Sequence, residues 1–193
     1  LVIEVINAVK HKNANASNSN SHGAAGGAVY VETAGGAEEH SGISNSTFIN
    51  CYSTGDGGAL YVKSDYFTLS DSIFTDNTAG DDGGAIDWEG DYGEISNLTA
   101  SGNSAISYGT SNSKGGTIII TGSCMKMNQL NITNSIAKAD SGHNGIQGGA
   151  IFLTGNYCNI TNAVFENCTV DFDGDDASGG ALYIIGNFTN IIC

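Results

Sequence analysis

Short apolar segments recur along the chain at nearly constant spacing. Each copy starts with a Gly-Gly pair and a small residue, followed by three mostly apolar residues, and six copies are present: 26–31, 57–62, 83–88, 115–120, 148–153 and 179–184. Counting the first glycine as zero, positions three and five are apolar in every copy. This period of two predicts a β-strand with one buried face.

Two further strand-like segments follow most copies. One holds an aromatic or aliphatic residue before Asn or a small residue, as in 48–51 and 74–77, and between it and the Gly-Gly pair lies another apolar stretch, as in 66–69. Three short strands in each of about six repeats of 26–33 residues predict an all-β parallel β-helix, a solenoid. We expect one domain over 1–193, with a first strand and an Asn/Ser-rich loop in 1–22 and the six repeats in 23–193.

The spacing of the repeats also predicts which residues stack. Position three of successive copies should form one ladder inside the solenoid: Leu60, Ile86, Ile118 and Ile151. The Gly-Gly pair should form a sharp turn at positive φ, which glycine adopts at little cost. We expect the amides of Asn77 and Asn103 to bond to neighbouring coils.

These motifs resemble known repeat families. Gly-Gly-Ala-aliphatic together with Phe-x-x-Asn at 74–77 resembles the repeats of the polymorphic outer membrane proteins of chlamydiae. The Asn-, Ser-, Thr- and Gly-rich composition, with pieces such as 167–169, resembles the large adhesin-like proteins of methanogenic archaea. The resemblance covers about residues 23–193 and implies a right-handed parallel β-helix displayed outside the cell, in adhesion or surface architecture. It implies no catalytic residues.

Position four of each copy should point outward, and it is large and apolar in five of six copies, with Asp87 as the exception. Either a long loop covers this column, or it is a contact stripe for a partner or a sister subunit. The predicted partner-contact stripe consists of Tyr30, Tyr61, Ile119, Phe152 and Tyr183.

The charge excludes several functions. The chain has 6 Lys, no Arg and 20 Asp plus Glu, for a formal net charge of −14, so its surface repels nucleic acid and anionic lipid. No apolar run is long enough for a membrane span. We expect no enzyme, because pectinase-type β-helix lyases commonly use Arg as the base; such a polysaccharide-active enzyme remains the second alternative.

Acidic residues gather before the Gly-Gly pairs, at Asp56, at 81–82 and in the run 171–176. The alternating carboxylates of Asp171, Asp173 and Asp175 are our candidate for a Ca²⁺ site, because hard cations bind several oxygens. The other reading is a solvated acidic turn. We expect no other cofactor.

Cysteines and sequons favour an extracellular location. Cys124 and Cys158 fall at similar places in successive repeats and are disulfide candidates, with two buried thiols as the alternative; Cys193 is the candidate for a bond between subunits. Seven Asn-x-Ser/Thr sequons are candidate glycosylation sites: Asn15, Asn45, Asn97, Asn131, Asn159, Asn167 and Asn187.

The sequence thus predicts an extracellular structural protein that self-associates. We expect a subunit of a cell-surface filament or a segment of an adhesin stalk, because solenoid ends expose unpaired strand edges that can pair head to tail. The chain opens without Met, as a processed subunit or a fragment would. The first alternative is a monomeric adhesin that binds a glycan or another host or cell-surface ligand.

Overall fold

The computed structural model describes residues 3–5, 10–12, 15–17, 19–21, 25–33, 41–107, 112–139, 145–172, 176–187 and 189–192. These residues form β-strands and no helix, and their strand pairs are parallel. None of the described segments is a helix with the length and apolarity needed to cross a membrane.

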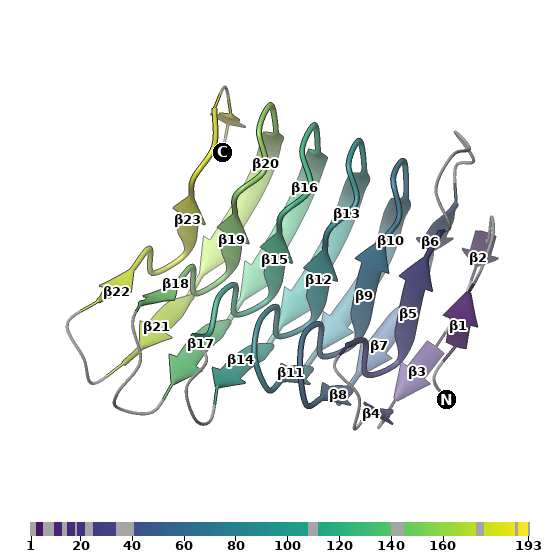
Figure 1. The fold of residues 1–193 in the computed structure, drawn as a ribbon, viewed down its shortest axis with the longest axis horizontal. Helices are drawn as coiled ribbons and strands as arrows, with labels where there is room; N and C mark the ends of the chain where they lie inside the picture. The colour runs from purple at the N-terminus through teal and green to yellow at the C-terminus, as the bar shows by residue number, and fades with distance from the viewer. Residues whose placement is uncertain are drawn as a thin grey trace.

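The strands lie in three main sheets that run the length of the molecule (Figure 1). Sheet A contains, in spatial order, β1 (Ile3–Val5), β5 (Val29–Glu32), β9 (Leu60–Lys63), β12 (Ile86–Trp88), β15 (Ile118–Ile120), β19 (Ile151–Leu153) and β23 (Leu182–Ile184). From β5 onward its strands follow one another at the spacing of the Gly-Gly copies, because each of the six copies contributes one strand.

Sheets B and C receive the other two strands of each repeat. Sheet B contains β2 (Lys10–Lys12), β6 (Gly42–Ser44), β10 (Thr68–Thr75), β13 (Glu94–Ser101), β16 (Lys126–Thr133), β20 (Asn159–Glu166) and β24 (Asn190–Ile192), with β3 (Asn15–Ser17) and β7 (Thr47–Ile49) beside this row. Sheet C contains β4 (Asn20–Ser21), β8 (Tyr52–Ser53), β11 (Thr78–Ala79), β14 (Ser104–Ser107), β17 (Ile136–Ala139) and β21 (Thr169–Asp171). A separate pair joins β18 (Ile146–Gln147) and β22 (Ala177–Ser178).

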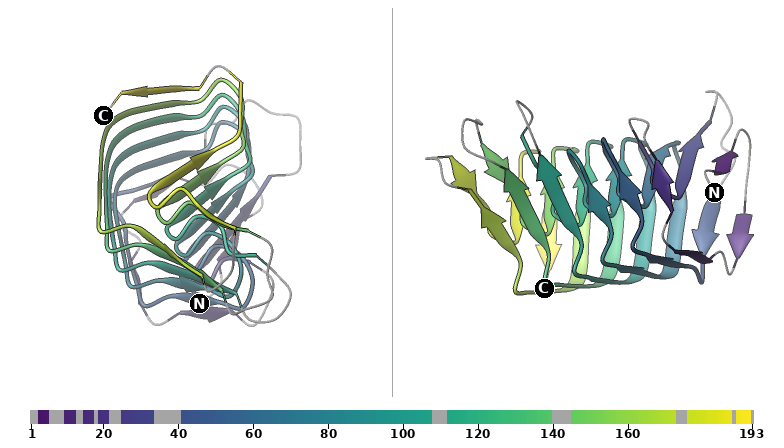
Figure 2. Two further views of the ribbon diagram at one scale, coloured as in Figure 1. Left: turned by 90° about the vertical axis from the view of Figure 1, so that its left-hand side faces the viewer. Right: turned by 90° about the horizontal axis from the view of Figure 1, so that it is seen from below.

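Strands of successive repeats superpose when the molecule is viewed along its length (Figure 2, left). Parallel strands in stacked sheets are consistent with a parallel β-solenoid, so the all-β, parallel prediction is confirmed. The predicted ladder is confirmed as well, since Ile86 pairs with Leu60 and with Ile118 in register. The ladder residues are fully buried, and each contributes roughly 1.5–3 kcal/mol of hydrophobic stabilisation.

Aromatic residues fill the space between the sheets. The rings of Phe48 and Phe74 stack with centroids 4.6 Å apart, and Phe67 meets Trp88 edge to face at 5.6 Å. The indole nitrogen of the buried Trp88 donates to the carbonyl of Gly90 at 3.1 Å, so its one polar group is satisfied. The core is therefore formed by side chains of neighbouring repeats that stack on one another, and a single repeat does not form it alone.

The Gly-Gly pair forms the corner before each strand of sheet A. The first glycine of all six pairs has φ between 59° and 70°, as predicted. The second glycine has a different role, because its neighbour in space is the backbone of the next repeat. A Cβ on Gly84, for example, would lie 2.0 Å from the carbonyl oxygen of Gly116. Only a residue without a side chain allows the repeats to approach this closely.

The predicted asparagine ladder is present in the core. Asn77 donates from Nδ2 to Oδ1 of Asn103 at 2.9 Å and to the carbonyl of Phe48 at 3.2 Å, while its own Oδ1 accepts from the backbone N–H of Cys51 at 3.0 Å. Asn103 repeats the motif by donating to the carbonyl of Phe74 at 3.0 Å. Both side chains are fully buried, so these bonds satisfy backbone groups that water cannot reach.

Candidate functional site

The residues at position four of the Gly-Gly copies form the outward column of sheet A. Strand pairing brings its six members into one row: Tyr30, Tyr61, Asp87, Ile119, Phe152 and Tyr183. The backbone folds inward at this corner (Figure 2, left), and a Cβ on Gly83 would lie 2.9 Å from Cγ2 of Ile119. As a result, Ile119 is only 6% exposed and Phe152 only 5%. The predicted stripe is therefore assembled, with little of its centre accessible.

Aromatic rings at the two ends of this stripe stack on each other. Tyr30 and Tyr61 have centroids 5.0 Å apart, and Phe152 and Tyr183 have centroids 5.5 Å apart, with nearly parallel planes in both pairs. Lys114 places its Nζ 5.3 Å from the centroid of Phe152, a cation–π distance. The stripe thus finds most of its partners within the chain.

Tyrosine hydroxyls connect the stripe to a row of charged residues. Tyr61 donates to Oε1 of Glu89 at 2.6 Å, and Tyr30 donates to Oε2 of Glu32 at 2.9 Å. Glu32 also pairs with Lys63, with 3.1 Å between Nζ and Oε1. Burial raises the pKa of Tyr61 far above its ordinary value, and the hydrogen bond to Glu89 adds to this shift, so the phenol stays a neutral donor.

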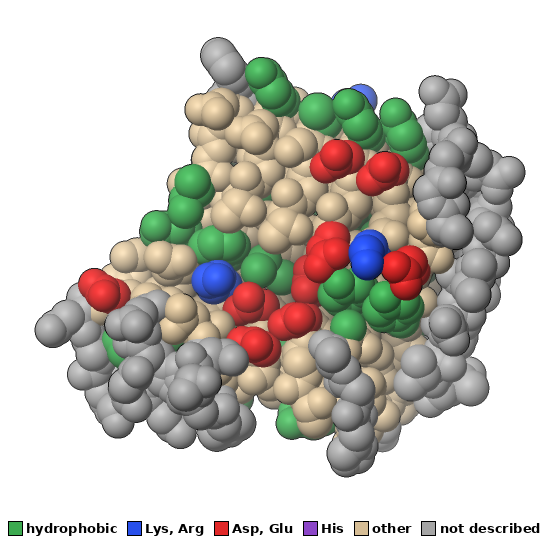
Figure 3. Space-filling model, in the orientation of Figure 1, with side chains coloured by type: hydrophobic (Ala, Val, Ile, Leu, Met, Phe, Trp, Pro, Cys, Tyr) green, Lys and Arg blue, Asp and Glu red, His purple; other side chains and the backbone are tan. Residues whose placement is uncertain are grey.

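Carboxylates converge in the middle of the same face. We name Asp56, Asp81, Asp82 and Asp87 the acidic corner. One carboxylate oxygen from each of the first three residues lies within 4.8 Å of the others. Figure 3 shows acidic side chains gathered across the middle of the face that carries sheet A. Residues from two repeats thus form one negative site.

Backbone hydrogen bonds hold the corner in place. Asp82 donates its N–H to Oδ1 of Asp56 at 3.1 Å, and Lys114 donates its N–H to Oδ1 of Asp82 at 2.7 Å. Asp87 enters from β12, where it pairs in register with Tyr61 and Ile119. A Cβ on Gly57 would lie 3.2 Å from the backbone nitrogen of Asp87, so the loop that carries Asp56 passes directly over this strand.

Burial makes the charged form of these aspartates costly. Desolvation raises the pKa of Asp82 to about 7, and the charges of Asp81 and Asp56 add to the shift, although Lys114 opposes it. Desolvation likewise raises the pKa of Asp56. The pKa of Asp87 rises well above its ordinary value, first by burial and then by the charges of Asp56, Glu89 and Asp82.

The raised pKa of Asp82 predicts a pH-dependent stability. In buffer without divalent cations, we expect the melting temperature to fall by several degrees between about pH 4 and about pH 8. The folded protein keeps a proton on Asp82 up to a pKa of about 7, whereas the unfolded chain releases it near the ordinary value of 3.8. The unfolded state therefore binds fewer protons in this window, and rising pH favours unfolding. Thermal melts across the pH range measure the effect.

The matched comparison uses two isosteric substitutions. Asp82→Asn should reduce the slope of melting temperature against pH, whereas Asp71→Asn should keep it, because Asp71 is an exposed residue of β10 away from the corner. An unchanged slope in Asp82→Asn would contradict the assignment.

Of the calcium candidates predicted from the sequence, Asp171 belongs to the described residues and lies outside the acidic corner. Asp171 is the last residue of β21 and pairs with Lys138, with 2.6 Å between Nζ and Oδ2. Asp173 and Asp175 lie outside the described residues. The sequence indicated the acidic residues before the Gly-Gly pairs, but it did not assign Asp87 to a site with them. The signal for Asp87 was a single carboxylate in an otherwise apolar column.

The two cysteines proposed as a disulfide lie in adjacent columns. Both are free in the structure, as are the other described cysteines, and Cys193 lies outside the described residues. Lys126 pairs with Asn159, so Cys158 is the register partner of Met125, and Cys124 is offset from it by one residue. Cys158 is fully buried and Cys124 is half-buried.

Six of the seven sequon asparagines have described side chains, and these lie on the surface. The side chain of Asn15 lies outside the described residues, and the other six are exposed: Asn45, Asn97, Asn131, Asn159, Asn167 and Asn187. Asn97, Asn131 and Asn159 lie in three different columns of sheet B. Asn131 pairs with Thr99 and Asn159 pairs with Lys126, whereas Asn97 follows Ser96, which pairs with Ser70. The six exposed asparagines thus stay candidates for glycosylation.

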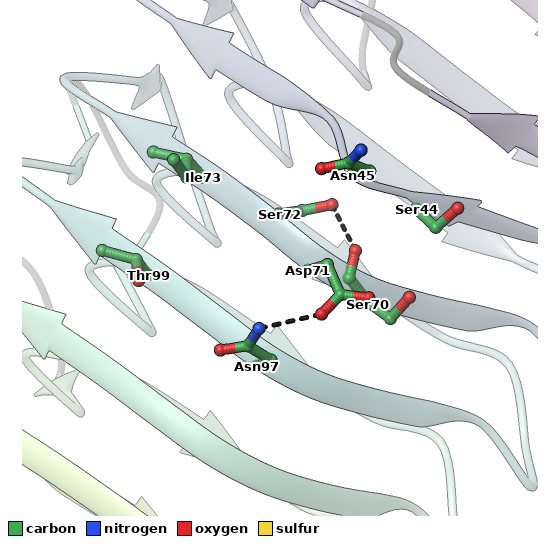
Figure 4. A pocket seen from close by; sticks show the side chains of 8 residues that line it. All are labelled: Ser44, Asn45, Ser70, Asp71, Ser72, Ile73, Asn97 and Thr99. Atoms are coloured by element: carbon green, nitrogen blue, oxygen red, sulfur yellow. Dashed lines mark hydrogen bonds between the residues drawn. The ribbon is translucent and has the colours of Figure 1, made fainter.

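A polar groove lies on the outside of sheet B, where the strands bend. It has a volume of about 750 Å³, and Figure 4 shows its lining: Ser44, Asn45, Ser70, Asp71, Ser72, Ile73, Asn97 and Thr99. Asp71 and Asn97 both have φ of 51°, and Asn97 donates to Oδ1 of Asp71 at 2.8 Å. The groove offers amides, hydroxyls and one carboxylate to a ligand.

Comparison with known proteins adds no assignment: no family model matches the chain, and no curated protein or solved structure matches it either.

Proposed function

We propose that the chain is an extracellular structural element, a right-handed parallel β-helix of about six coils that stacks end to end in a surface filament or an adhesin stalk. The arrangement of the sheets supports this. Strands β1 and β23 are the outer strands of sheet A, β2 and β24 those of sheet B, and all pairs run parallel. A further coil added at either edge continues the same pattern, and such head-to-tail contacts propagate.

The observation that carries the proposal is the exposure of core positions at the last strands. Ile191 of β24 pairs with Ile160, which is fully buried, yet Ile191 itself is 41% exposed. Leu182 and Ile184 of β23 are half-buried, although the residues paired with them in β19 are fully buried. The last strands thus carry apolar residues at positions that are buried in the preceding coil, and a further coil stacked on them would bury these side chains.

The backbone at this edge supports the same proposal. The N–H groups of Ala150 and Ile151 both donate to the carbonyl of Ala181, at 2.8 and 3.0 Å. The equivalent groups of Ala181 and Leu182 have no backbone acceptor within the described part of the chain. Unpaired strand edges of this kind are templates for further strands.

Ile191→Lys should block stacking. A lysine in the core column would have to be buried without a counter-charge, so we expect the protein concentration at which oligomers form to rise at least about tenfold. Light scattering over a concentration series, with negative-stain electron microscopy of the same samples, measures it. Ile73→Lys is the matched control, because Ile73 is 45% exposed on the side of the stack and Ile191 41% at its end.

Dispersed wild-type monomers at every concentration would contradict end-to-end stacking. That result would favour the monomeric adhesin, for which the groove of Figure 4 is the candidate glycan site. The acidic corner is the feature that favours a polysaccharide-active enzyme, since paired carboxylates of different pKa can act as acid and base. Turnover of an acidic polysaccharide by the wild-type monomer, lost in Asp82→Asn, would support that alternative.

A further inference from the structure

Asp87 is a buried carboxylate that has no hydrogen-bond partner among the described residues. Its side chain is only 5% exposed, and no hydrogen bond to its carboxylate is found among the described residues. Its neighbours in sheet A are the ring of Tyr61 and the aliphatic side chain of Ile119, and the Tyr61 hydroxyl is turned to Glu89 instead. A buried polar group that makes no hydrogen bond is costly, and a buried charge is more so.

The charges around Asp87 increase this cost. Asp56, Glu89 and Asp82 are the groups whose charge acts on it, and all three are acidic. Lys114 is the cation that acts on Asp56 and Asp82 within the described residues, and its ammonium lies over the ring of Phe152. Lys63, the other lysine of this face, is paired with Glu32. The acidic corner thus gathers more negative charge than its surroundings balance.

We propose that the acidic corner binds a calcium ion, held by carboxylate oxygens of Asp56, Asp81 and Asp82 and charge-balanced by the unpartnered Asp87. The ligand chemistry favours this ion, because Ca²⁺ accepts irregular sets of carboxylate oxygens whereas Mg²⁺ demands near-ideal octahedral geometry. The three oxygens lie within 4.8 Å of one another, close enough for one cation to gather them.

The site also explains why the corner is built from two repeats. Asp56 precedes one Gly-Gly pair, whereas Asp81 and Asp82 precede the next, and Asp82 already bonds to Asp56 through its N–H. A cation shared by both corners joins neighbouring coils across the same seam as this hydrogen bond. The ion would therefore stabilise stacking within one molecule, independently of any assembly between molecules.

Calorimetric titration of the chelator-treated protein with CaCl₂ tests the proposal. We expect one site with a dissociation constant of about 0.1–1 mM, the range of extracellular calcium modules, and weaker binding of MgCl₂. Asp81→Asn and Asp87→Asn should each weaken calcium binding at least about tenfold, because the first removes a charged ligand and the second removes a negative charge beside the ion. Asp171→Asn is the matched control and should bind as the wild type does.

Thermal melts separate a binding role from a structural one. Without calcium, Asp87→Asn should melt at a higher temperature than the wild type above neutral pH, since it replaces a carboxyl group that must either bury a charge among like charges or hold a proton against the pH. With calcium, the wild type should gain several degrees and Asp87→Asn should gain much less. Absence of calcium binding by the wild type would overturn the proposal. So would equal responses to Ca²⁺ and Mg²⁺, or loss of binding in Asp171→Asn with Asp87→Asn unaffected.

Discussion

Gly84→Ala should lower the melting temperature by roughly 10 °C, corresponding to about 3 kcal/mol or more of lost stability. The added Cβ would lie 2.0 Å from the carbonyl oxygen of Gly116 and 2.4 Å from the carbonyl carbon of Ser104. Both atoms belong to the backbone, so neither moves aside by a change of rotamer. The two repeats must separate, which opens the core beneath them. Thermal or urea unfolding followed by circular dichroism measures the loss.

The chain provides its own control for this substitution. Gly180 is the second glycine of the last pair, and among the described residues a Cβ there would meet only the carbonyl oxygen of Cys168, at 3.7 Å. Neither Gly84 nor Gly180 has a positive φ, so backbone strain does not separate them. At a concentration where the protein is monomeric, Gly180→Ala should change the stability by less than about 0.5 kcal/mol. Equal losses at both positions would refute the explanation by close approach of the repeats.

Asn77→Ala should be the most damaging polar substitution we propose, at about 4 kcal/mol. It leaves the N–H of Cys51 and the carbonyl of Phe48 without their partner and removes the donor to Asn103. Each unsatisfied buried group costs about 1–3 kcal/mol, because water does not reach this part of the core. Urea unfolding with a fitted midpoint measures the effect.

Asn131→Ala is the control for the asparagine ladder. Asn131 is exposed on β16, and its removal should change stability by less than about 0.5 kcal/mol. A small effect of Asn77→Ala would mean that a water molecule or a shift of the backbone takes over the lost hydrogen bonds.

The features that the sequence predicted well are those that repeat. The stacking of Leu60 on Ile86 was predictable because the apolar alternation and the position of the Gly-Gly pair independently indicate the same register. The same repetition predicted the positive φ of the first glycine and the hydrogen bond between Asn77 and Asn103. A residue type that recurs at the same position of each coil has the same structural role in each.

The features that the sequence did not predict depend on how the coil is bent. Alternation correctly placed Ile119 on the outer side of its strand, but the inward fold of the corner covers it, and no pattern of residues signals that concavity. The same bend brings Asp87 to Asp56, which lies 31 positions earlier in the chain. Cys124 and Cys158 differ by one place within the repeat, and one place is enough to separate an outward from an inward column.

The connections between the sheets differ in how constant their length is. In three successive repeats, eight residues separate the start of the strand in sheet A from the start of the strand in sheet B. From sheet C to the Gly-Gly corner, by contrast, Thr78 precedes Asp82 by four residues, while its register partner Ser104 precedes Lys114 by ten. Extra length enters between sheets A and B where Val29 precedes Gly42 by 13 residues, whereas from Ile86 onward it enters at the connection from sheet C to the corner, and the frame of three sheets stays constant. Such a frame is suited to carrying grafted peptides, because segments inserted at that connection leave the buried ladders unchanged.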